Sequence, residues 1–332
     1  MDDRSDPPTE TTAHELDADR LLSQLNGCTG TPQYSRNDAT EMVGIDPERS
    51  DRVWSAFGFS NNDPDAKVLT EDDVQALALM SMIDNAQPER MALEVAMARS
   101  IGQTMSRLAD WEASQFAEVL SDPTMDVSMS QVVTAIERIH SLIWRRHFAA
   151  AITSLAATAD PDHRPQSIGF ADLVGYTSLS RRVGLTELSD LLETFETHAH
   201  RAIIDAGGAV VKTIGDEVMY SADTADTAAE IAMRLQQLPD HHDLPQLRGG
   251  VATGKVLWRF GDVFGEPVNI AARLTGSARP GTVLVDKNCA DAITDPRFRL
   301  RFIPPLNVRG YRRLSARVLS YARVTADQGS EK

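Results

Sequence analysis

The hydrophobic pattern of the chain changes at the segment DPDHRPQS, residues 160–167. Before this segment apolar residues recur at helical spacings, whereas after it short apolar runs typical of strands alternate with helical stretches. Two prolines within eight residues are typical of a linker. The sequence therefore predicts an all-helical domain at 13–158, a linker at 159–167, an α+β domain at 168–324, and disordered tails at 1–12 and 325–332.

The first domain carries the signals of helices. Thr70 precedes three acidic residues in VLTEDDVQALALMSMI, the pattern of an N-cap followed by a first turn that suits the helix dipole. Long helices are expected at 88–120 and at 129–156. The second of these has Ile136, Ile139 and Ile143 at spacings of three and four, so its apolar face must be covered by something.

The second domain alternates between strand and helix patterns. Apolar runs on both sides of the turn IGD predict a hairpin. We expect a mixed sheet with helices on one face. The expected order is a strand at 167–172, a helix at 178–205, hairpin strands at 209–214 and 217–222, a helix at 225–238, strands near 246–258, a helix at 267–278 and three short strands.

Charge and cysteine content narrow the functional classes. Of the net charge of -15, residues 1–150 hold nearly all, with 26 Asp and Glu against 12 Lys and Arg, which disfavours contact with nucleic acid. Cys28 and Cys289 lie too far apart for a zinc motif. The acidic start is unlike a secretory signal, and no apolar run reaches the length of a bilayer span. The expected location is the cytoplasm.

Two aspartates end predicted strands. Asp172 lies in GFADLVGYTSLS and Asp216 in the hairpin segment VVKTIGDEVMY. Two carboxylates on neighbouring strand ends can hold two magnesium ions that share oxygen ligands with substrate phosphates. The amides of Gly175, Tyr176 and Thr177, at the start of a predicted helix, would suit a polyphosphate. Taken singly, an aspartate at a strand end is more often a cap of a turn or a helix.

A third segment adds to this pattern. FGDVFGEPVNIAARL, residues 260–274, runs from the glycine-flanked Asp262 into a helix with Asn269 and Arg273 four residues apart, on one face. An arginine at this position can neutralise charge that develops on a phosphate. An isolated arginine on a helix is more often a solvated surface residue. This segment therefore indicates phosphate chemistry only in combination with the segments that contain Asp172 and Asp216.

Together the three segments resemble the catalytic domain of class III adenylyl cyclases, over about residues 168–321. The resemblance implies a ferredoxin-like, palm-type α+β fold. It also implies that Asp172 and Asp216, with the backbone carbonyl of Leu173, bind two Mg²⁺ or Mn²⁺ ions. Lys212 and Asp262 match the family's adenine-selecting pair, and Asn269 and Arg273 match the Asn and Arg of its VNxAxR helix.

The resemblance further implies an enzyme that converts ATP to cyclic AMP and pyrophosphate. Family members use head-to-tail pairs of catalytic domains, and this chain contains both residue sets in one domain, so a homodimer with two equivalent sites is expected. The cation for the terminal phosphates matches Arg309 in LNVRGYRR, with Arg259 and Lys255 as alternatives and a solvated surface role for Arg309 left open.

The helical half resembles the N-terminal regulatory half of a subgroup of bacterial class III cyclases. The resemblance implies regulation by residues 13–128 and transmission by the helix at 129–156, in response to an unknown small molecule or to pH. The segment 37–59 is also loosely similar to the helix-turn-helix of MerR-like regulators, which leaves a nucleotide-sensing DNA-binding regulator as the alternative. Its helix DPERSDRVWSAF has no surplus of positive charge.

Overall fold

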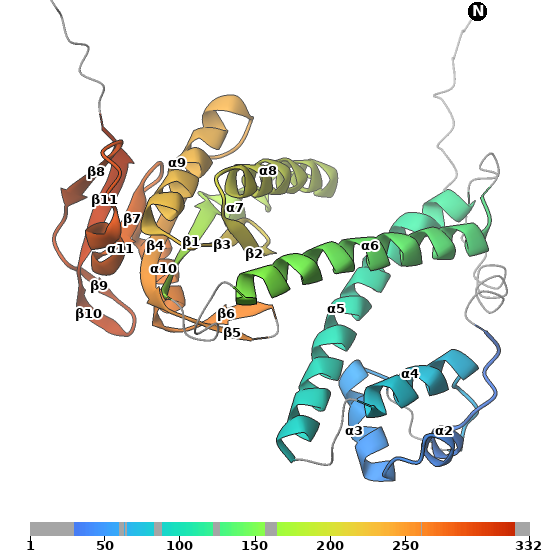
Figure 1. Ribbon diagram of the computed structural model, residues 1–332. Helices are drawn as coiled ribbons and strands as arrows, with labels where there is room; N and C mark the ends of the chain where they lie inside the picture. Colours follow the sequence, from blue (N-terminus) through green and yellow to red (C-terminus); the bar gives the residue numbers. More distant parts are fainter. Residues whose placement is uncertain are drawn as a thin grey trace, which may run out of the picture. The chain divides into compact units, whose positions relative to one another are not determined.

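The structure is a computed structural model that describes residues 30–59, 63, 65–82, 88–121, 127–156, 165–259 and 261–322. The chain divides into two compact units, Met1–Thr153 and Ser154–Lys332 (Figure 1). The predicted tails, Cys28 and most of the predicted linker lie outside the described residues. Among the described helices, none combines the length and the apolar character needed to cross a membrane.

The N-terminal unit contains helices, in agreement with the sequence, and one isolated bridge between Tyr34 and Leu69. Capping boxes at Ser35 and Thr70 start the first and third of these helices, so the predicted N-cap at Thr70 is confirmed. The predicted helix at 129–156 is confirmed at both ends. The helices are α2 (Arg36–Val43), α3 (Pro47–Phe57), α4 (Glu71–Ser81), α5 (Pro88–Ser121) and α6 (Met129–Ala156).

A small core and a buried ion pair hold α3 in this unit. Trp54 of α3 is buried against Leu69, Val74 and Leu77. Arg49 of α3 donates two hydrogen bonds to Glu94 of α5, at 2.9 and 2.8 Å, and both side chains are nearly buried. A two-point ion pair of this kind fixes the orientation of both helices. Removing one partner would leave a buried charge unpaired.

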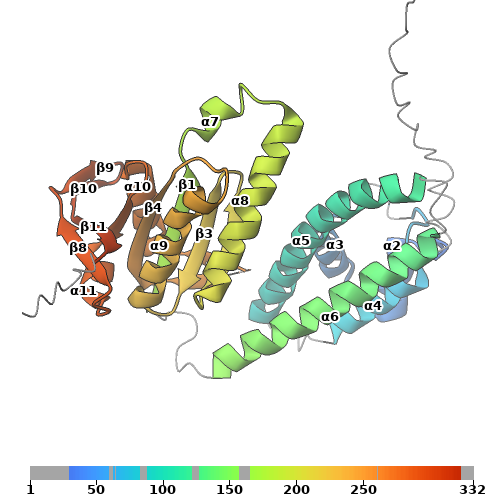
Figure 2. The ribbon, with the colours of Figure 1, turned by 90° about the horizontal axis from the view of Figure 1, so that it is seen from above.

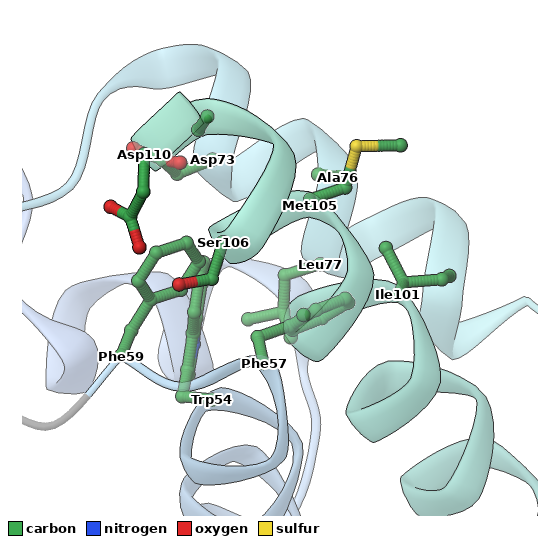
Figure 3. Close-up of a pocket in the computed structure, with 12 residues that line it drawn as sticks. Trp54, Phe57, Phe59, Asp73, Ala76, Leu77, Ile101, Met105, Ser106 and Asp110 are labelled. Atoms are coloured by element: carbon green, nitrogen blue, oxygen red, sulfur yellow. The ribbon is translucent and has the colours of Figure 1, made fainter. Parts of the chain in front are cut away.

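An open pocket of about 470 Å³ lies between α5 and the α3–α4 layer (Figure 3). Phe57, Phe59 and Trp54 form one side of it, and Ile101 and Met105 of α5 form another. The indole nitrogen of Trp54 is buried and has no hydrogen-bond partner among the described residues. The N-terminal unit thus has an apolar recess on its surface.

The C-terminal unit is built on a seven-stranded sheet with the order β2-β3-β1-β4-β7-β11-β8. All its neighbours are antiparallel except β4 and β7. The strands are β1 (Pro165–Leu173), β2 (Ala209–Ile214), β3 (Glu217–Ala222), β4 (Leu247–Lys255), β7 (Val283–Asp286), β8 (Phe298–Phe302) and β11 (Ala316–Tyr321). Two small two-stranded sheets pair β5 (Leu257–Arg259) with β6 (Asp262–Phe264), and β9 (Leu306–Val308) with β10 (Tyr311–Leu314).

Helices cover both faces of this sheet, and the expectation of helices on one face was wrong. On one face, α8 (Leu185–Asp205), α9 (Ala225–His241) and the short α11 (Lys287–Ala292) pack over Leu173, Tyr220 and Val251, with α8 and α9 side by side (Figure 2). On the other face, α10 (Glu266–Ser277) packs over Phe170 and Ala252. Because Gly250 has no side chain, α10 comes close to β4.

Three further boundaries differ from the sequence expectations. The helix predicted at 178–205 is two helices, α7 (Tyr176–Leu179) and α8, because the chain becomes extended at Gly184, a poor helix former. Strand β1 begins at Pro165, so the last three residues of the predicted linker belong to the sheet. The C-terminal part holds α11 and the strands β7 to β11, rather than three strands.

Candidate active site

Strand register brings a cluster of charged side chains together at one end of the central strands. Asp172 on β1 lies opposite Glu217 on β3 and opposite Arg248 on β4. Its neighbours Ala171 and Leu173 point into the core under α8 and α9. Because side chains alternate along a strand, Asp172, Glu217 and Arg248 share the face that α10 covers.

The hairpin between β2 and β3 adds Asp216 to this cluster. Its two loop residues are Gly215, with a φ of 60°, and Asp216. A glycine with positive φ at the first position of a two-residue loop suits a tight hairpin turn. The backbone N–H of Leu173 donates to the Asp216 carbonyl at 3.1 Å and fastens the turn to the end of β1. The two predicted metal aspartates are therefore neighbours in space.

The carboxylates of this cluster share one positively charged neighbour, the guanidinium of Arg248. The Arg248 guanidinium donates to Asp172, with Nε 2.6 Å from Oδ2. Partial burial, a hydrogen bond with Asp172 and its negative charge raise the pKa of Asp216 to about 6. Burial, together with the charges of Asp172 and Asp216, raises the pKa of Glu217 to about 7. The cluster thus holds more negative charge than Arg248 neutralises.

Such a cluster suits a divalent cation. Magnesium prefers oxygen ligands and usually retains positions for substrate phosphates or water. Asp172 and Asp216 supply carboxylates next to the backbone carbonyl of Leu173, and the pKa of Asp216 is raised by burial and by its contact with Asp172. Within the described part of the chain, no three His, Cys, Asp or Glu side chains are placed to hold a metal by themselves. The donor set therefore fits metals that share ligands with a polyphosphate.

A second ion pair lies on the same face, on the outer strand. Lys212 of β2 donates to Asp262 of β6, with Nζ 2.6 Å from Oδ2. Partial burial opposes ionisation of Asp262, but the hydrogen bonds from Lys212 and from the Val263 N–H lower its pKa overall. Both side chains remain about one-third exposed, at 39% and 34%. The pair thus offers a cationic donor and an anionic acceptor side by side.

A bulge in β2 makes this pair possible. Val210 is opposite Tyr220 and packs into the core under α8 and α9, whereas Lys212 is opposite Met219, whose side chain lies on the α10 side. Val211 has no partner in the register and also packs on the α10 side. One extra residue therefore turns Lys212 toward Asp262, away from the face that simple alternation would give it.

Helix α10 carries the two remaining predicted catalytic residues on its outer face. Asn269 and Arg273 are both exposed, while Ala271 and Leu274 are buried beneath them. Neither polar side chain forms a hydrogen bond or an ion pair with another described residue. The structure does not join them to the carboxylate cluster within one chain.

The predicted phosphate-binding residues lie in several places. Gly175, with a φ of 81°, leads into α7, where the N–H groups of Tyr176 and Thr177 come before the first N–H that donates to the Gly175 carbonyl, that of Ser178. Arg309 is exposed in the turn between β9 and β10. Of its alternatives, Lys255 lies opposite Pro165 at the far end of β4 from Arg248, and Arg259 ends β5 next to Asp262.

Sequence reasoning missed two members of the cluster, Arg248 and Glu217. Glu217 is the residue directly after Asp216, so its position in the hairpin was available from the segment KTIGDEVM. Arg248 lies 76 positions from Asp172, and only the register of β1 with β4 brings the two together. No local pattern in QLRGGVATGK marks the residue.

Comparisons with known proteins identify the family of the chain. Residues 159–321 match the family model for the adenylate and guanylate cyclase catalytic domain. An adenylate cyclase of Streptomyces coelicolor is 38% identical over 311 residues, which cover 89% of this chain and 81% of the relative. An adenylate cyclase of Streptomyces griseus is 40% identical over 270 residues, with coverages of 76% and 67%.

A third relative, described as a pH-sensitive adenylate cyclase of Mycobacterium tuberculosis, is 31% identical over 313 residues, covering 87% of this chain and 78% of the relative. These matches extend into the helical unit, since each covers more of the chain than the sheet-containing unit does. The chain therefore belongs to the class III adenylyl cyclases.

Proposed function

We propose that the protein converts ATP to 3′,5′-cyclic AMP and pyrophosphate. The observation that carries the choice of ATP is the ion pair of Lys212 with Asp262. A protonated lysine can donate to adenine N1 while the carboxylate accepts from the N6 amino group. Guanine presents a donor at N1 and an acceptor at O6, so the same pair opposes it.

In this proposal, Asp172 and Asp216 hold two Mg²⁺ or Mn²⁺ ions, with the Leu173 carbonyl as a further ligand. When bound, such ions acidify the ribose 3′-hydroxyl and neutralise the triphosphate. The 3′-oxygen forms a bond to the α-phosphorus while the bond to the pyrophosphate oxygen breaks. Arg248 supports the reaction by holding Asp172 in place, as its hydrogen bond to that carboxylate indicates.

The remaining residues bind and orient the substrate. Asn269 positions the ribose, and Arg273 stabilises the negative charge that develops around the α-phosphorus. The amides of Gly175, Tyr176 and Thr177 bind the phosphates. Arg309, in the exposed turn between β9 and β10, reaches the terminal phosphates. These roles are those that the family resemblance implies for the matching positions.

The proposed active form is a homodimer in which two chains build each site. One chain supplies Asp172 and Asp216, and the other supplies Lys212, Asp262, Asn269 and Arg273. Two observations support this division: Lys212 and Asp262 pair within one chain, and Asn269 and Arg273 are exposed without a polar partner among the described residues.

Helix α6 offers a surface for the same dimer. Ile139, Ile143 and Trp144 are 57%, 47% and 59% exposed in the single chain. The sequence predicts that this apolar face is covered, and no described residue of the chain buries it. Large exposed apolar patches are typical of interaction surfaces. We therefore place α6 in the dimer and assign it the transmission of regulatory changes to the catalytic domain.

The N-terminal unit is the proposed regulatory domain. Relative rotation of two catalytic domains would assemble or separate the composite sites, which is a common form of switching. The pocket beside Trp54 and Ile101 is our candidate place for a small-molecule signal, and the hydrogen bond of His140 on α6 to Glu112 on α5, 2.8 Å long, links the pocket-bearing helix to α6. The proposed location of the enzyme is the cytoplasm, where ATP is available.

The alternative of DNA binding fits the structure less well. In the helix DPERSDRVWSAF, Arg49 is buried in its ion pair with Glu94 and Arg52 is paired with Glu48 at 3.8 Å. A recognition helix needs arginines that are free to reach phosphates and base edges. Both arginines of α3 are therefore engaged in ion pairs, and the pair of Arg49 is nearly buried.

The test is product analysis of the full-length protein incubated with ATP or GTP in the presence of Mn²⁺. We expect cyclic AMP from ATP and little cyclic GMP from GTP. Lys212→Glu should abolish the preference for ATP, whereas Arg201→Glu, a charge reversal on the exposed surface of α8, should leave it unchanged. Absence of any cyclic product from the folded wild-type dimer would refute the proposal.

A further inference from the structure

A second cavity lies on the α10 side of the sheet, near its β8 edge, and has no part in the proposed reaction. Its volume is about 410 Å³. It extends from the last turn of α10, at Ser277, to the β8–β9 connection at Pro304 and Pro305. The strands that line it, β7, β11 and β8, are two, three and four positions from β1 in the sheet, and none of Asp172, Asp216, Glu217 and Arg248 lines it. The cavity is therefore separate from the carboxylate cluster.

The floor of this cavity is apolar because of the strand register. Leu284 on β7 lies opposite Val318 on β11, and Val318 lies opposite Arg301 on β8. These three residues form one row across the sheet, and Ile303 and Leu306 extend the apolar surface beside them. A ligand that rests on this row meets carbon atoms from at least four positions.

Two arginines stand at the edge of the apolar floor. Arg301 ends the row on β8, and Arg279 comes from the turn that follows α10. Thr282 fixes that turn, since its backbone N–H and its hydroxyl both donate to the Arg279 carbonyl, at 3.0 and 2.7 Å. Two arginines from different elements, the turn after α10 and the strand β8, thus line the same cavity.

Neither arginine has an acidic partner among the described residues. Two other arginines of the same region are paired, since Arg297 contacts Asp295 and Glu230 and Arg317 contacts Asp291. Two unpaired guanidinium groups next to an apolar surface create a site of positive potential without a local counter-charge. Guanidinium groups bind carboxylates through two parallel hydrogen bonds, which favours such an anion over a neutral group.

We propose that this cavity, here called the Arg279–Arg301 pocket, binds a small organic anion with an apolar body and a carboxylate head. The apolar body lies on Leu284, Val318 and Ile303, and the carboxylate lies between Arg279 and Arg301. A pocket of a few hundred Å³ that is mostly apolar, with a few convergent polar groups, is typical of small-molecule sites. The proposal does not depend on cyclase activity, because binding is measured without nucleotide.

The test uses octanoate as the probe and the full-length protein with ¹³C-labelled isoleucine methyl groups. The methyl signal of Ile303, identified by its loss in Ile303→Leu, reports on the pocket itself. We expect octanoate to shift this signal in a saturable manner. 1-Octanol, which has the tail without the charge, and acetate, which has the charge without the tail, should shift it far less at equal concentration.

Variants distinguish octanoate binding through the two arginines from non-specific hydrophobic binding. Arg279→Ala combined with Arg301→Ala should weaken octanoate binding at least about tenfold, because charge-assisted hydrogen bonds are lost. Arg299→Ala is the matched control, since Arg299 lies two residues before Arg301 on the same strand face and does not line the pocket. Arg279→Lys with Arg301→Lys retains the charges and should retain part of the affinity.

Three results would overturn the proposal. These are an equal response of Ile303 to 1-octanol, unchanged octanoate binding in the folded double alanine variant, or methyl shifts confined to Ile101, which lines the pocket of the N-terminal unit. Thermal unfolding of each variant shows whether it is folded, and because both arginines are exposed, their replacement should leave the melting temperature within a few degrees.

Discussion

The carboxylate cluster and the outer face of α10 lie on the same side of one sheet, but they differ in the polar partners that a single chain provides. In the cluster, Asp172 is held by Arg248 and Asp216 is fastened to β1 by the Leu173 N–H. On α10, Asn269 and Arg273 face outward without polar partners among the described residues. The chain thus organises its proposed metal-binding half by itself and leaves the other half for a substrate or a second chain.

The largest expected effect comes from the cluster. Asp172→Asn should lower the rate of cyclic AMP formation by at least about a thousandfold, because it removes a charged ligand of both proposed metals. Cyclic AMP is measured by chromatography at saturating ATP and Mn²⁺. Asp190→Asn, on the exposed surface of α8, is the control and should retain full activity. A rate within tenfold of wild type for Asp172→Asn would show that the cluster does not bind the metals.

Mixing two inactive variants tests whether the halves come from different chains. Arg273→Ala should also be nearly inactive. After the two variants are mixed and allowed to exchange chains, half of the dimers are mixed, and each has one intact and one doubly altered site. Activity should then return to about a quarter of the wild-type value. No recovery, although mixed dimers are demonstrated by mass spectrometry, would place both halves of a site in one chain.

The contact of α10 with β4 fixes the distance between the two regions, and it depends on a glycine. A Cβ at Gly250 would lie 2.4 Å from the Ala271 carbonyl oxygen and 2.5 Å from the Thr275 nitrogen, both in the backbone of α10. Gly250→Ala should therefore push α10 outward and lower the free energy of unfolding by about 2–3 kcal/mol. Urea unfolding measures the loss.

Gly276→Ala is the matched control on α10 itself. A Cβ there has nothing within 4 Å, so the substitution should be neutral or slightly stabilising. If the two glycine variants unfolded at the same urea concentration, close packing of α10 on β4 would not be what sets the position of Asn269 and Arg273.

Features with a local sequence signal were predicted more closely than features that depend on strand register. The helix at 129–156 and the hairpin around Gly215 were predicted closely, because a long apolar period and a turn signal are local features. The side of the sheet that Lys212 occupies was not predictable, since strict alternation places it with Val210 and only the bulge at Val211 reverses it. Arg248 was missed because its link to Asp172 depends on strand register.

The predicted roles of the site residues remain predictions, with the geometry as support.

The break at Gly184 and the placement of α10 on the second face were missed because both depend on more than local sequence preference. Local propensity favours one helix over 178–205, and the choice of face for α10 depends on packing against Gly250, which no local pattern reports. Positions fixed by contacts distant in sequence are therefore the ones that needed the structure.

The smallest expected effect concerns the excess negative charge of the cluster in protein freed of metal by EDTA. The pKa of Glu217 is raised to about 7 in the folded chain, mainly by burial, so the folded state binds a proton that the unfolded state releases above pH 4.5. Its contribution to stability is complete below about pH 4.5 and is lost as the pH rises to about 7. Asp216, with a pKa of about 6, acts in the same direction.

Glu217→Gln should therefore flatten the decline of stability between pH 4.5 and 7, while a glutamine retains the shape and the polarity of the side chain. Urea unfolding of both proteins across this range measures the difference, which solvent screening keeps small because the side chain is only partly buried. Glu196→Gln on the exposed surface of α8 is the control and should follow wild type. Equal slopes for Glu217→Gln and wild type would mean that the pKa of Glu217 is not raised in the folded chain.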